Sequence, residues 1–157
     1  MANFPGWDGK VEELLQPRQS PYLLGLGLEG FVRCLKVWNL DKVDKAGTPE
    51  LVRCSRLTRP GSQSEPVSLA VSENLMLMGV GYDDGGVVLY RGDCTRDKGF
   101  KVKVLIEQGT QVTGMAFKAV ESGIYLYIAT TADVLMFNVS VKDRETRSVL
   151  DSLGCSR

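Results

Sequence analysis

Histidine is absent from the chain, although its 157 residues include 19 basic and 19 acidic ones. Histidine is the commonest general base, so every Ser-His-Asp or Cys-His catalytic device is excluded. The adjacent carboxylates Asp83 and Asp84 lie in the stretch "DDGG", which favours a hairpin turn over an acid–base pair. The zero net charge lacks the basic excess that is typical of nucleic-acid-binding domains. We therefore expect no catalytic residue and no nucleic-acid partner.

Long apolar runs are also absent, and the N-terminal "MANFPGWDGK" lacks the charged-then-apolar pattern of a secretory signal. The sequence thus predicts a cytoplasmic protein. Its four cysteines, Cys34, Cys54, Cys94 and Cys155, are widely spaced and form no C-x-x-C pair. That spacing disfavours a metal site, and a reducing compartment favours free structural thiols. We expect neither a metal nor a cofactor.

One motif argues for a ligand at first sight, because residues 25–30 read Gly-Leu-Gly-Leu-Glu-Gly. In the G-x-G-x-x-G fingerprint a helix begins inside the motif and its N-terminus holds a pyrophosphate. Residues 31–40 are instead rich in β-branched and aromatic residues with alternating polarity, which predicts a strand. The sequence favours a β-hairpin, with strands at 22–28 and 32–40 joined by a Glu-Gly turn, over a nucleotide site.

The same hairpin pattern occurs three times, at residues 21–40, 74–93 and 123–140. Each copy has an apolar segment, small residues, an acidic or glycine turn and a second apolar segment. A further strand is expected before each hairpin (11–15, 66–71 and 112–117) and after each hairpin (51–57, 102–106 and 148–153). Four antiparallel strands recurring at roughly 40–50 residues are typical of the blade of a β-propeller.

The predicted fold class is therefore all-β: a partial β-propeller of about three WD-like blades, near residues 11–57, 67–106 and 112–153. Trp38 resembles the tryptophan of WD repeats, although the usual Gly-His partner is missing. Closed propellers have about four to eight blades, so we expect the chain to be a piece of a larger propeller. Residues 1–9 are interpreted as an atypical extension before it.

Specific residues then point to a family. The segments 35–42, 71–98, 112–117 and 130–143 are similar to the amino-terminal propeller of the vacuolar protein sorting-associated protein 11 family. Three motifs in a fixed order carry most of the resemblance, which covers about residues 10–157: Glu73-Asn74-Leu75, Gly81-Tyr82-x-Asp84-Gly85 and Gly92-Asp93-Cys94-Thr95-Arg96-Asp97.

The resemblance implies a non-enzymatic role in the HOPS and CORVET tethering complexes, which act before membrane fusion at endosomes and lysosomes or vacuoles. The implied partners are other tethering subunits, with no small-molecule ligand and with indirect, peripheral contact to the cytosolic face of the membrane. The α-solenoid and RING zinc domain of such proteins have no counterpart in these residues. Two alternatives remain from the residues alone: a WD-like adaptor with an unrelated partner, and an enzyme using the glycine-rich turn.

Propellers act through binding surfaces on their loops and faces. The polar loops at 92–98 and 41–50 are the candidate contact surfaces, and solvated connections are the alternative interpretation. Tyr82, Tyr125 and Tyr127 are candidate aromatic anchors, although the alternation of the last two favours burial. The candidate contact residues are Asp93, Arg96, Asp97, Lys98, Asp41, Lys42 and Lys45.

Overall fold

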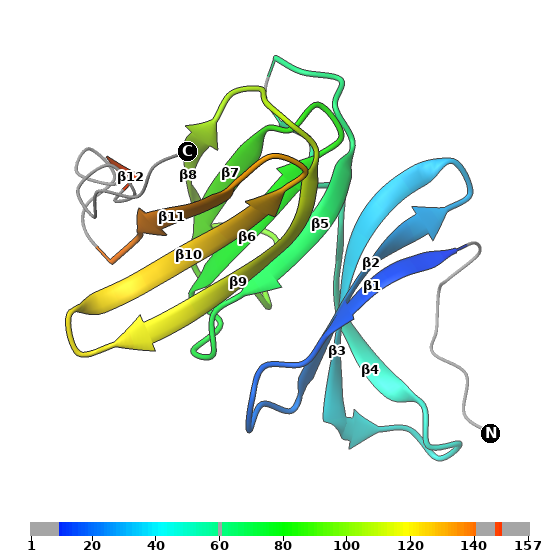
Figure 1. Cartoon of the computed structure of the whole chain (residues 1–157). Helices are drawn as coiled ribbons and strands as arrows, with labels where there is room; N and C mark the ends of the chain where they lie inside the picture. The colour runs from blue at the N-terminus through cyan, green and yellow to red at the C-terminus, as the bar shows by residue number, and fades with distance from the viewer. Residues whose placement is uncertain (1–9, 60, 141–146, 149–157) are drawn as a thin grey trace.

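The computed structural model describes residues 10–59, 61–140 and 147–148, which form three antiparallel sheets (Figure 1). The first sheet holds β1 (Val11–Leu15), β2 (Tyr22–Glu29), β3 (Val32–Val43) and β4 (Pro49–Ser55). The second holds β5 (Pro66–Val71), β6 (Leu77–Tyr82), β7 (Val87–Arg91) and β8 (Lys101–Ile106). The third holds β9 (Val112–Val120), β10 (Gly123–Thr130), β11 (Val134–Asn138) and β12 (Arg147–Ser148).

Within each sheet, every strand pairs with its neighbour in sequence, as in a propeller blade. The all-β, partial-propeller prediction is confirmed. Part of the strand predicted at 148–153 falls outside the described residues. Within the described part of the chain, no helix is long and apolar enough to cross a membrane.

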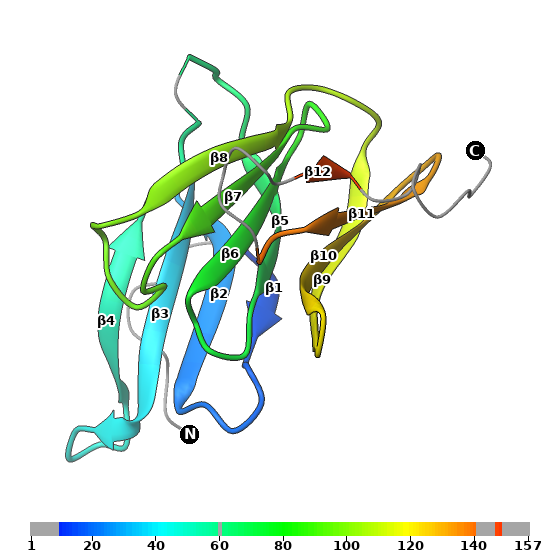
Figure 2. The same cartoon turned by 90° about the vertical axis from the view of Figure 1, so that its left-hand side faces the viewer.

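The three sheets pack face to face in chain order, with the second sheet between the other two (Figures 1 and 2). Among the first strands of the sheets, β5 contacts both β1 and β9. Because side chains alternate along a strand, β6 serves both neighbours at once: Met78 and Val80 pack toward the first sheet, and Leu77 packs toward the third.

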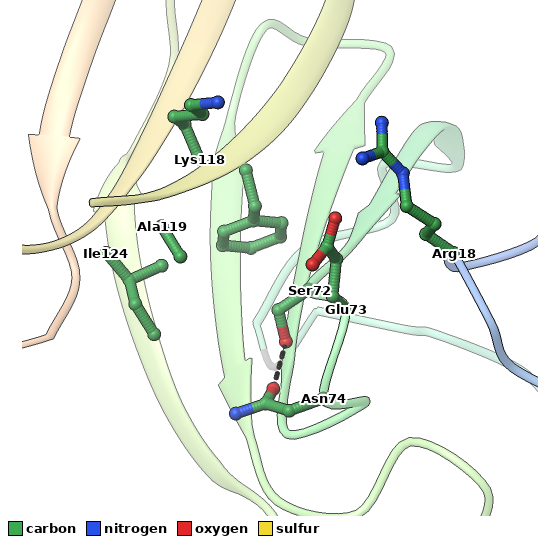
Figure 3. Close-up of a pocket in the computed structure, with 8 residues that line it drawn as sticks. Arg18, Ser72, Glu73, Asn74, Lys118, Ala119 and Ile124 are labelled. Atoms are coloured by element: carbon green, nitrogen blue, oxygen red, sulfur yellow. Dashed lines mark hydrogen bonds between the residues drawn. The ribbon is translucent and has the colours of Figure 1, made fainter. Parts of the chain in front are cut away.

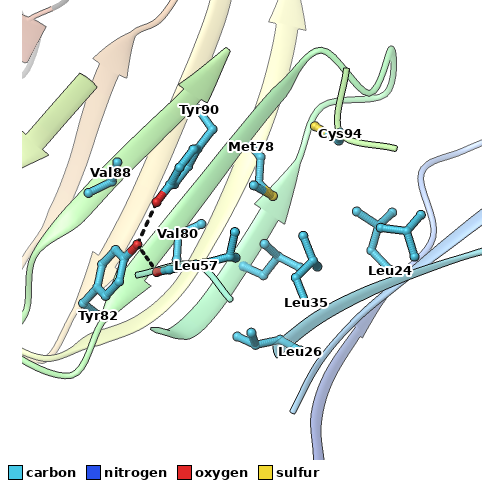
Figure 4. Packing of buried hydrophobic residues seen from close by; sticks show 12 residues of the cluster. Leu24, Leu26, Leu35, Leu57, Met78, Val80, Tyr82, Val88, Tyr90 and Cys94 are labelled. Carbon is cyan, nitrogen blue, oxygen red and sulfur yellow. Dashed lines mark hydrogen bonds between the residues drawn. The ribbon is translucent and has the colours of Figure 1, made fainter. Parts of the chain in front are cut away.

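The interface between the first and second sheets is built from large side chains (Figure 4). Leu24, Leu26 and Leu35 meet Met78 and Val80 in one buried cluster. Burying such side chains contributes about 1.5–3 kcal/mol each, so this cluster is a main source of stability.

The interface between the second and third sheets instead depends on a glycine, Gly79, whose lack of a side chain leaves space for a neighbouring leucine. A Cβ built on Gly79 would lie 3.2 Å from Leu126 Cδ2 and 3.7 Å from Met115 Sδ. The glycine leaves room for Leu126, which is fully buried. Leu126 and Ile128 of β10 then pack with Leu77 and Leu89 of the second sheet.

The glycine-rich stretch forms the expected hairpin. Strands β2 and β3 pair from Tyr22↔Asn39 to Glu29↔Val32, which leaves Gly30 and Phe31 as the turn, one residue later than predicted. Gly30 has φ 61°, a conformation that glycine adopts at low cost. A strand follows the motif where a dinucleotide site requires a helix.

The glycines of the first two repeats face opposite ways. A Cβ built on Gly25 would lie 3.0 Å from Cζ3 of Trp38 in the same sheet, while the neighbouring Leu24 and Leu26 face the second sheet. Gly79, by contrast, itself faces the next sheet. Aligning the repeats on their glycines therefore shifts the first blade by one residue, which exchanges the two faces of a strand.

The polar segment 41–50 is less of a loop than predicted. Strand β3 continues to Val43 and β4 begins at Pro49, so Asp41 and Lys42 lie on a strand. Trp38 is accordingly inside β3 rather than near its end, and it is 1% exposed.

Candidate functional site

The connection from β7 to β8, residues 92–100, is the most ordered of the predicted contact loops. Asp93 Oδ1 accepts hydrogen bonds from the Thr95 amide at 3.0 Å and the Thr95 hydroxyl at 2.7 Å. The Thr95 hydroxyl, followed by the amide and the nearby Arg96, holds the pKa of Asp93 below its usual range. Asp93 thus shapes the turn, and its carboxylate already accepts hydrogen bonds from Thr95.

Arg53 of β4 ties this loop of the second sheet to the first sheet. Its Nη1 donates to the Cys94 carbonyl at 2.9 Å, and its Nε lies 3.2 Å from Asp97 Oδ1. The guanidinium also lies over the Phe100 ring, 4.9 Å from the centroid. Burial lowers the pKa of Arg53, an effect that the charge of Asp97 opposes. The loop is therefore held in one position by a buried cation from the neighbouring sheet.

The loop also bonds to the turn between β5 and β6. The Cys94 amide donates to the Leu75 carbonyl at 2.9 Å, and the Gly92 amide donates to Met76 at 3.0 Å. Asn74 Oδ1 accepts from the Met76 amide at 3.1 Å and shapes that turn. Burial raises the pKa of Cys94 to about 12, so its thiol stays protonated. Two of the three motifs that carried the family resemblance thus serve to join these turns.

The remaining motif, Gly81-Tyr82-x-Asp84-Gly85, forms the β6–β7 turn and bonds it to the chain before β5. Asp84 accepts hydrogen bonds from Arg59, from the Ser64 hydroxyl at 2.7 Å and from the Gly86 amide at 2.9 Å. Burial alone would raise the pKa of Asp84, but these hydrogen bonds outweigh it and hold the pKa below its usual range. A Cβ on Gly86 would collide with Arg59 Nη1. The hairpin-turn interpretation of "DDGG" is confirmed.

A groove of about 380 Å³ lies between β4 and the 92–100 loop. Arg53 and Asp97 both line it and form an ion pair, while the exposed Arg56 and Lys98 add positive charge. Phe100 supplies a half-buried aromatic wall. The groove can receive an acidic side chain beside an apolar one, and we call it the Arg53 groove. Its lining consists of Arg53, Ser55, Arg56, Leu57, Thr58, Tyr90, Asp97, Lys98, Gly99 and Phe100.

The structure brings Asp97 and Lys98 to this groove and leaves Arg96 beside it, with a side chain 78% exposed and paired with Asp93. The second candidate segment is built differently. Lys42 lies 3.7 Å from Glu50 across an exposed hairpin, and Lys45 is exposed. Among the described residues, no hydrogen bond or ion pair joins this hairpin to the 92–100 loop.

Asp44, which the sequence analysis did not single out, holds the turn of that hairpin. Its Oδ1 accepts from the Ala46 amide at 2.8 Å and the Thr48 amide at 2.9 Å. Asp41 is placed by its own amide, which donates to Asn39 Oδ1 at 3.1 Å. The hairpin is thus organised by hydrogen bonds from its own amides to its own side chains.

Three tyrosines were predicted as exposed anchors, and the prediction is wrong for Tyr82, which is fully buried. Its hydroxyl donates to the Leu57 carbonyl at 2.7 Å and lies 2.9 Å from the Tyr90 hydroxyl (Figure 4). Burial raises its pKa, so the phenol stays neutral. Tyr127 is 37% exposed, and Tyr125 is half-buried with its hydroxyl 3.2 Å from Ser122 Oγ.

A second hollow, of about 420 Å³, lies where β9 and β10 approach the β5–β6 turn (Figure 3). Ser72 Oγ donates to Asn74 Oδ1 at 2.7 Å in its wall, so these polar groups serve the turn. Exposed Arg18, Glu73 and Lys118 surround it with charges of both signs.

The structure also gathers donor atoms that linear spacing did not predict. The Cys34 and Cys54 sulfurs and a Glu29 carboxylate oxygen all lie within 4.8 Å of one another. They come from β3, β4 and β2, and the registers Leu35↔Ser55 and Glu29↔Val32 place them together. Burial, reinforced by the neighbouring Cys54 and Glu29, raises the pKa of Cys34. Only the register of the hairpins, which the sequence did not supply, could have revealed this cluster.

Comparison with known proteins agrees with the motifs. The family model described as PEP5/VPS11 N-terminal matches residues 1–157. A vacuolar protein sorting-associated protein 11 homolog from Mus musculus is 37% identical over 160 residues, which are 99% of this chain and 16% of the relative. A homolog from Dictyostelium discoideum is 28% identical over 163 residues, or 98% of this chain and 17% of the relative. The chain thus spans about one-sixth of the length of these curated relatives. On the full-length family match and the identity to the mouse protein, the chain belongs to the PEP5/VPS11 N-terminal family.

Proposed function

We propose that this chain is the non-catalytic propeller portion of a membrane-tethering subunit and acts through protein–protein contacts in vacuolar or endolysosomal protein sorting. Its partners are other subunits of the HOPS or CORVET complexes. Its contact with the cytosolic face of late endosomes, lysosomes or vacuoles is indirect and passes through those partners. The names of the relatives, all vacuolar protein sorting-associated protein 11 homologs, support the sorting role.

The observation that carries the proposed mode of action is the fixed position of the 92–100 loop. Arg53 clamps the loop through the Cys94 carbonyl and Asp97, and the β5–β6 turn holds its first residues. A pre-ordered loop loses little conformational entropy on binding. The Arg53 groove therefore offers a prepared surface, with Arg56 and Lys98 as exposed positive charges in its lining.

A binding role also fits the state of the acidic side chains. Asp84 and Asp93 are both held by turn hydrogen bonds, with the pKa of each below its usual range. Carboxylates in that state are poor general bases near neutral pH. Asp84 and Asp93 therefore have structural roles, and partner recognition falls to the exposed charges of the groove.

The experiment is the co-purification of the intact gene product after charge reversal at the groove, Arg56→Glu together with Lys98→Glu. Exposed charges at an interface contribute mainly to the association rate and specificity of such contacts. We expect the recovery of tethering-complex subunits to fall by roughly tenfold, which corresponds to about 1.4 kcal/mol. The control is Lys10→Glu, which reverses one charge, half the change of the double variant, at an exposed residue away from the groove.

Full recovery of the subunits with the doubly reversed protein would overturn the groove as the contact surface. A wild-type protein that retrieves only partners unrelated to membrane tethering would overturn the tethering role itself and favour the generic adaptor. Lys42→Glu with Lys45→Glu tests the other candidate hairpin, and a loss confined to that pair would place the contact there.

A further inference from the structure

Three adjacent strands present a set of metal-binding donor types on one face of the first sheet. Glu29 is at the end of β2, Cys34 near the start of β3 and Cys54 near the end of β4. Their donor atoms lie within 4.8 Å of one another. Because all three belong to hydrogen-bonded strands, their spacing is set by the sheet and not by a flexible loop.

The donor types are specific in what they would hold. Two thiolates and a carboxylate suit a thiophilic divalent cation such as Zn²⁺, whose bonds are about 2.3 Å to sulfur and about 2.0–2.2 Å to oxygen. The donor atoms lie within 4.8 Å of one another, so side-chain rotations must bring them closer to reach those lengths around one ion. Cys54 is exposed, and the Glu29 side chain is 41% exposed. An ion can therefore enter from solvent, and a water molecule can complete a tetrahedral shell.

The surrounding charge is also balanced for such an ion. Lys36 Nζ lies 2.8 Å from Glu29 Oε2, and the Lys36 side chain is 2% exposed. Two thiolates and one carboxylate on a divalent cation carry one net negative charge, which the positive charges of Lys36 and the nearby Arg56 compensate. Lys36 also orients the carboxylate, as outer-shell partners of metal ligands do.

We propose that Glu29, Cys34 and Cys54 form a zinc-type site that clamps β2, β3 and β4 together, with Lys36 as the positioning residue for Glu29. None of its three ligands lines the Arg53 groove, although Arg56 of that groove interacts electrostatically with Cys34. Its ligands are far apart in sequence and occur without a C-x-x-C pair, which is why the expectation of no metal site arose.

The test uses the whole 157-residue chain, reduced and freed of metal, titrated with Cd²⁺ alone and then with Zn²⁺ in competition. Thiolate ligation of cadmium gives an ultraviolet charge-transfer band that is independent of any activity. We expect one saturable ion per chain, displaced by Zn²⁺. The Cys54→Ser chain should lose at least about 100-fold in affinity, and Glu29→Gln at least about tenfold, since even outer-shell changes cost about 10–100-fold.

The matched control is Cys94→Ser, which removes a thiol outside the cluster and should leave the titration unchanged. Cys54 is exposed, so its replacement by serine is compatible with folding, which circular dichroism would verify. A wild-type chain without the charge-transfer band would overturn the site. The same conclusion follows if Cys34→Ser and Cys54→Ser bind Cd²⁺ as the wild type does.

Discussion

The two interfaces between sheets are built on different principles. Between the first and second sheets, polar groups cross the boundary: the Leu69 amide donates to Glu13 Oε2 at 3.0 Å, and Arg53 donates to the Cys94 carbonyl at 2.9 Å. Between the second and third sheets, the match is mainly one of shape, with Leu126 filling the space left by Gly79. A hydrogen bond also crosses this interface, from Arg91 Nη1 to the Val139 carbonyl at 2.6 Å.

The difference shows where surface features of this fold are fixed. Hydrogen bonds are directional, so the first interface sets the position of a particular loop as well as the distance between two sheets. Apolar packing is non-directional, so the second interface fixes mainly the separation of its sheets. The prepared groove lies on the interface with the buried cation, which is where a surface of defined shape is expected.

The largest expected effect comes from breaking the shape match. Leu126→Ala should destabilise the chain by about 3 kcal/mol, because a buried leucine is replaced and a cavity remains. Adding Gly79→Ala should recover part of this loss, since the new methyl group points at the vacated Leu126 position. Urea denaturation of the single and double variants gives the coupling free energy between the two sites.

The control for that cycle is Gly114→Ala, because a Cβ at Gly114 meets nothing within 4 Å. Its effect should add to that of Leu126→Ala without coupling. Strict additivity of Gly79→Ala and Leu126→Ala would contradict the shape-matching account of this interface.

The next effect comes from removing the buried cation. Arg53→Met keeps much of the apolar stem but leaves the Cys94 carbonyl without its donor, so we expect a loss of about 2 kcal/mol. Amide exchange in residues 92–100 should rise at the same time. Arg96→Ala is the matched control, since that side chain is 78% exposed and should change stability by less than about 0.5 kcal/mol. Unchanged exchange in the loop after Arg53→Met would show that the arginine does not position it.

Much of this fold follows from pattern alone. Strands such as 11–15 and 66–71 have the observed bounds, because a short apolar run bounded by turn residues is a local signal. Turn chemistry likewise identified "DDGG" as a hairpin. The end of β3 was misplaced because Asp41, Lys42 and Val43 extend a two-stranded ribbon into solvent, where polar residues are no signal of a loop.

The site was less predictable, because its determinants come from other blades. Asp97 was a candidate by its charge, but its partner Arg53 lies 44 residues away on another sheet. Asp84 is held by Arg59 from the linker between the first two blades. The Glu29, Cys34 and Cys54 cluster depends on strand register. Such contacts are non-local, and a single sequence gives composition and period but no register between hairpins.

The smallest expected effect compares two glutamates. Glu13 accepts a hydrogen bond from Leu69 of the second sheet, whereas Glu12 bonds to Arg33 within its own sheet. Burial raises the pKa of Glu13 above its ordinary value of 4.5, although the Leu69 amide opposes this. Hydrogen bonding from Arg33 lowers the pKa of the adjacent Glu12, against a weaker effect of burial. A raised carboxyl pKa means that the folded state favours the protonated acid, so the contribution of Glu13 is present below about pH 4.5 and is lost as pH rises. The contribution of Glu12 has the opposite sign: it is present at neutral pH and is lost on acidification.

Replacing each glutamate by glutamine therefore tests whether the two carboxylates contribute to stability with opposite signs. At pH 7, Glu13→Gln should stabilise the chain by a few tenths of a kcal/mol, since a partly buried charge is removed while an acceptor for Leu69 remains. Glu12→Gln should destabilise it by less than about 1 kcal/mol, the range of partly exposed ion pairs. The Glu13 difference should shrink toward zero as pH falls below about 4.5, whereas the Glu12 difference should persist to lower pH because the pKa of that carboxyl is depressed. Stability curves from urea denaturation across this pH range measure both. Effects of the same sign at pH 7 would mean that the carboxylate at the interface is stabilised by its hydrogen bond more than burial penalises it, and the two ties would then be equivalent.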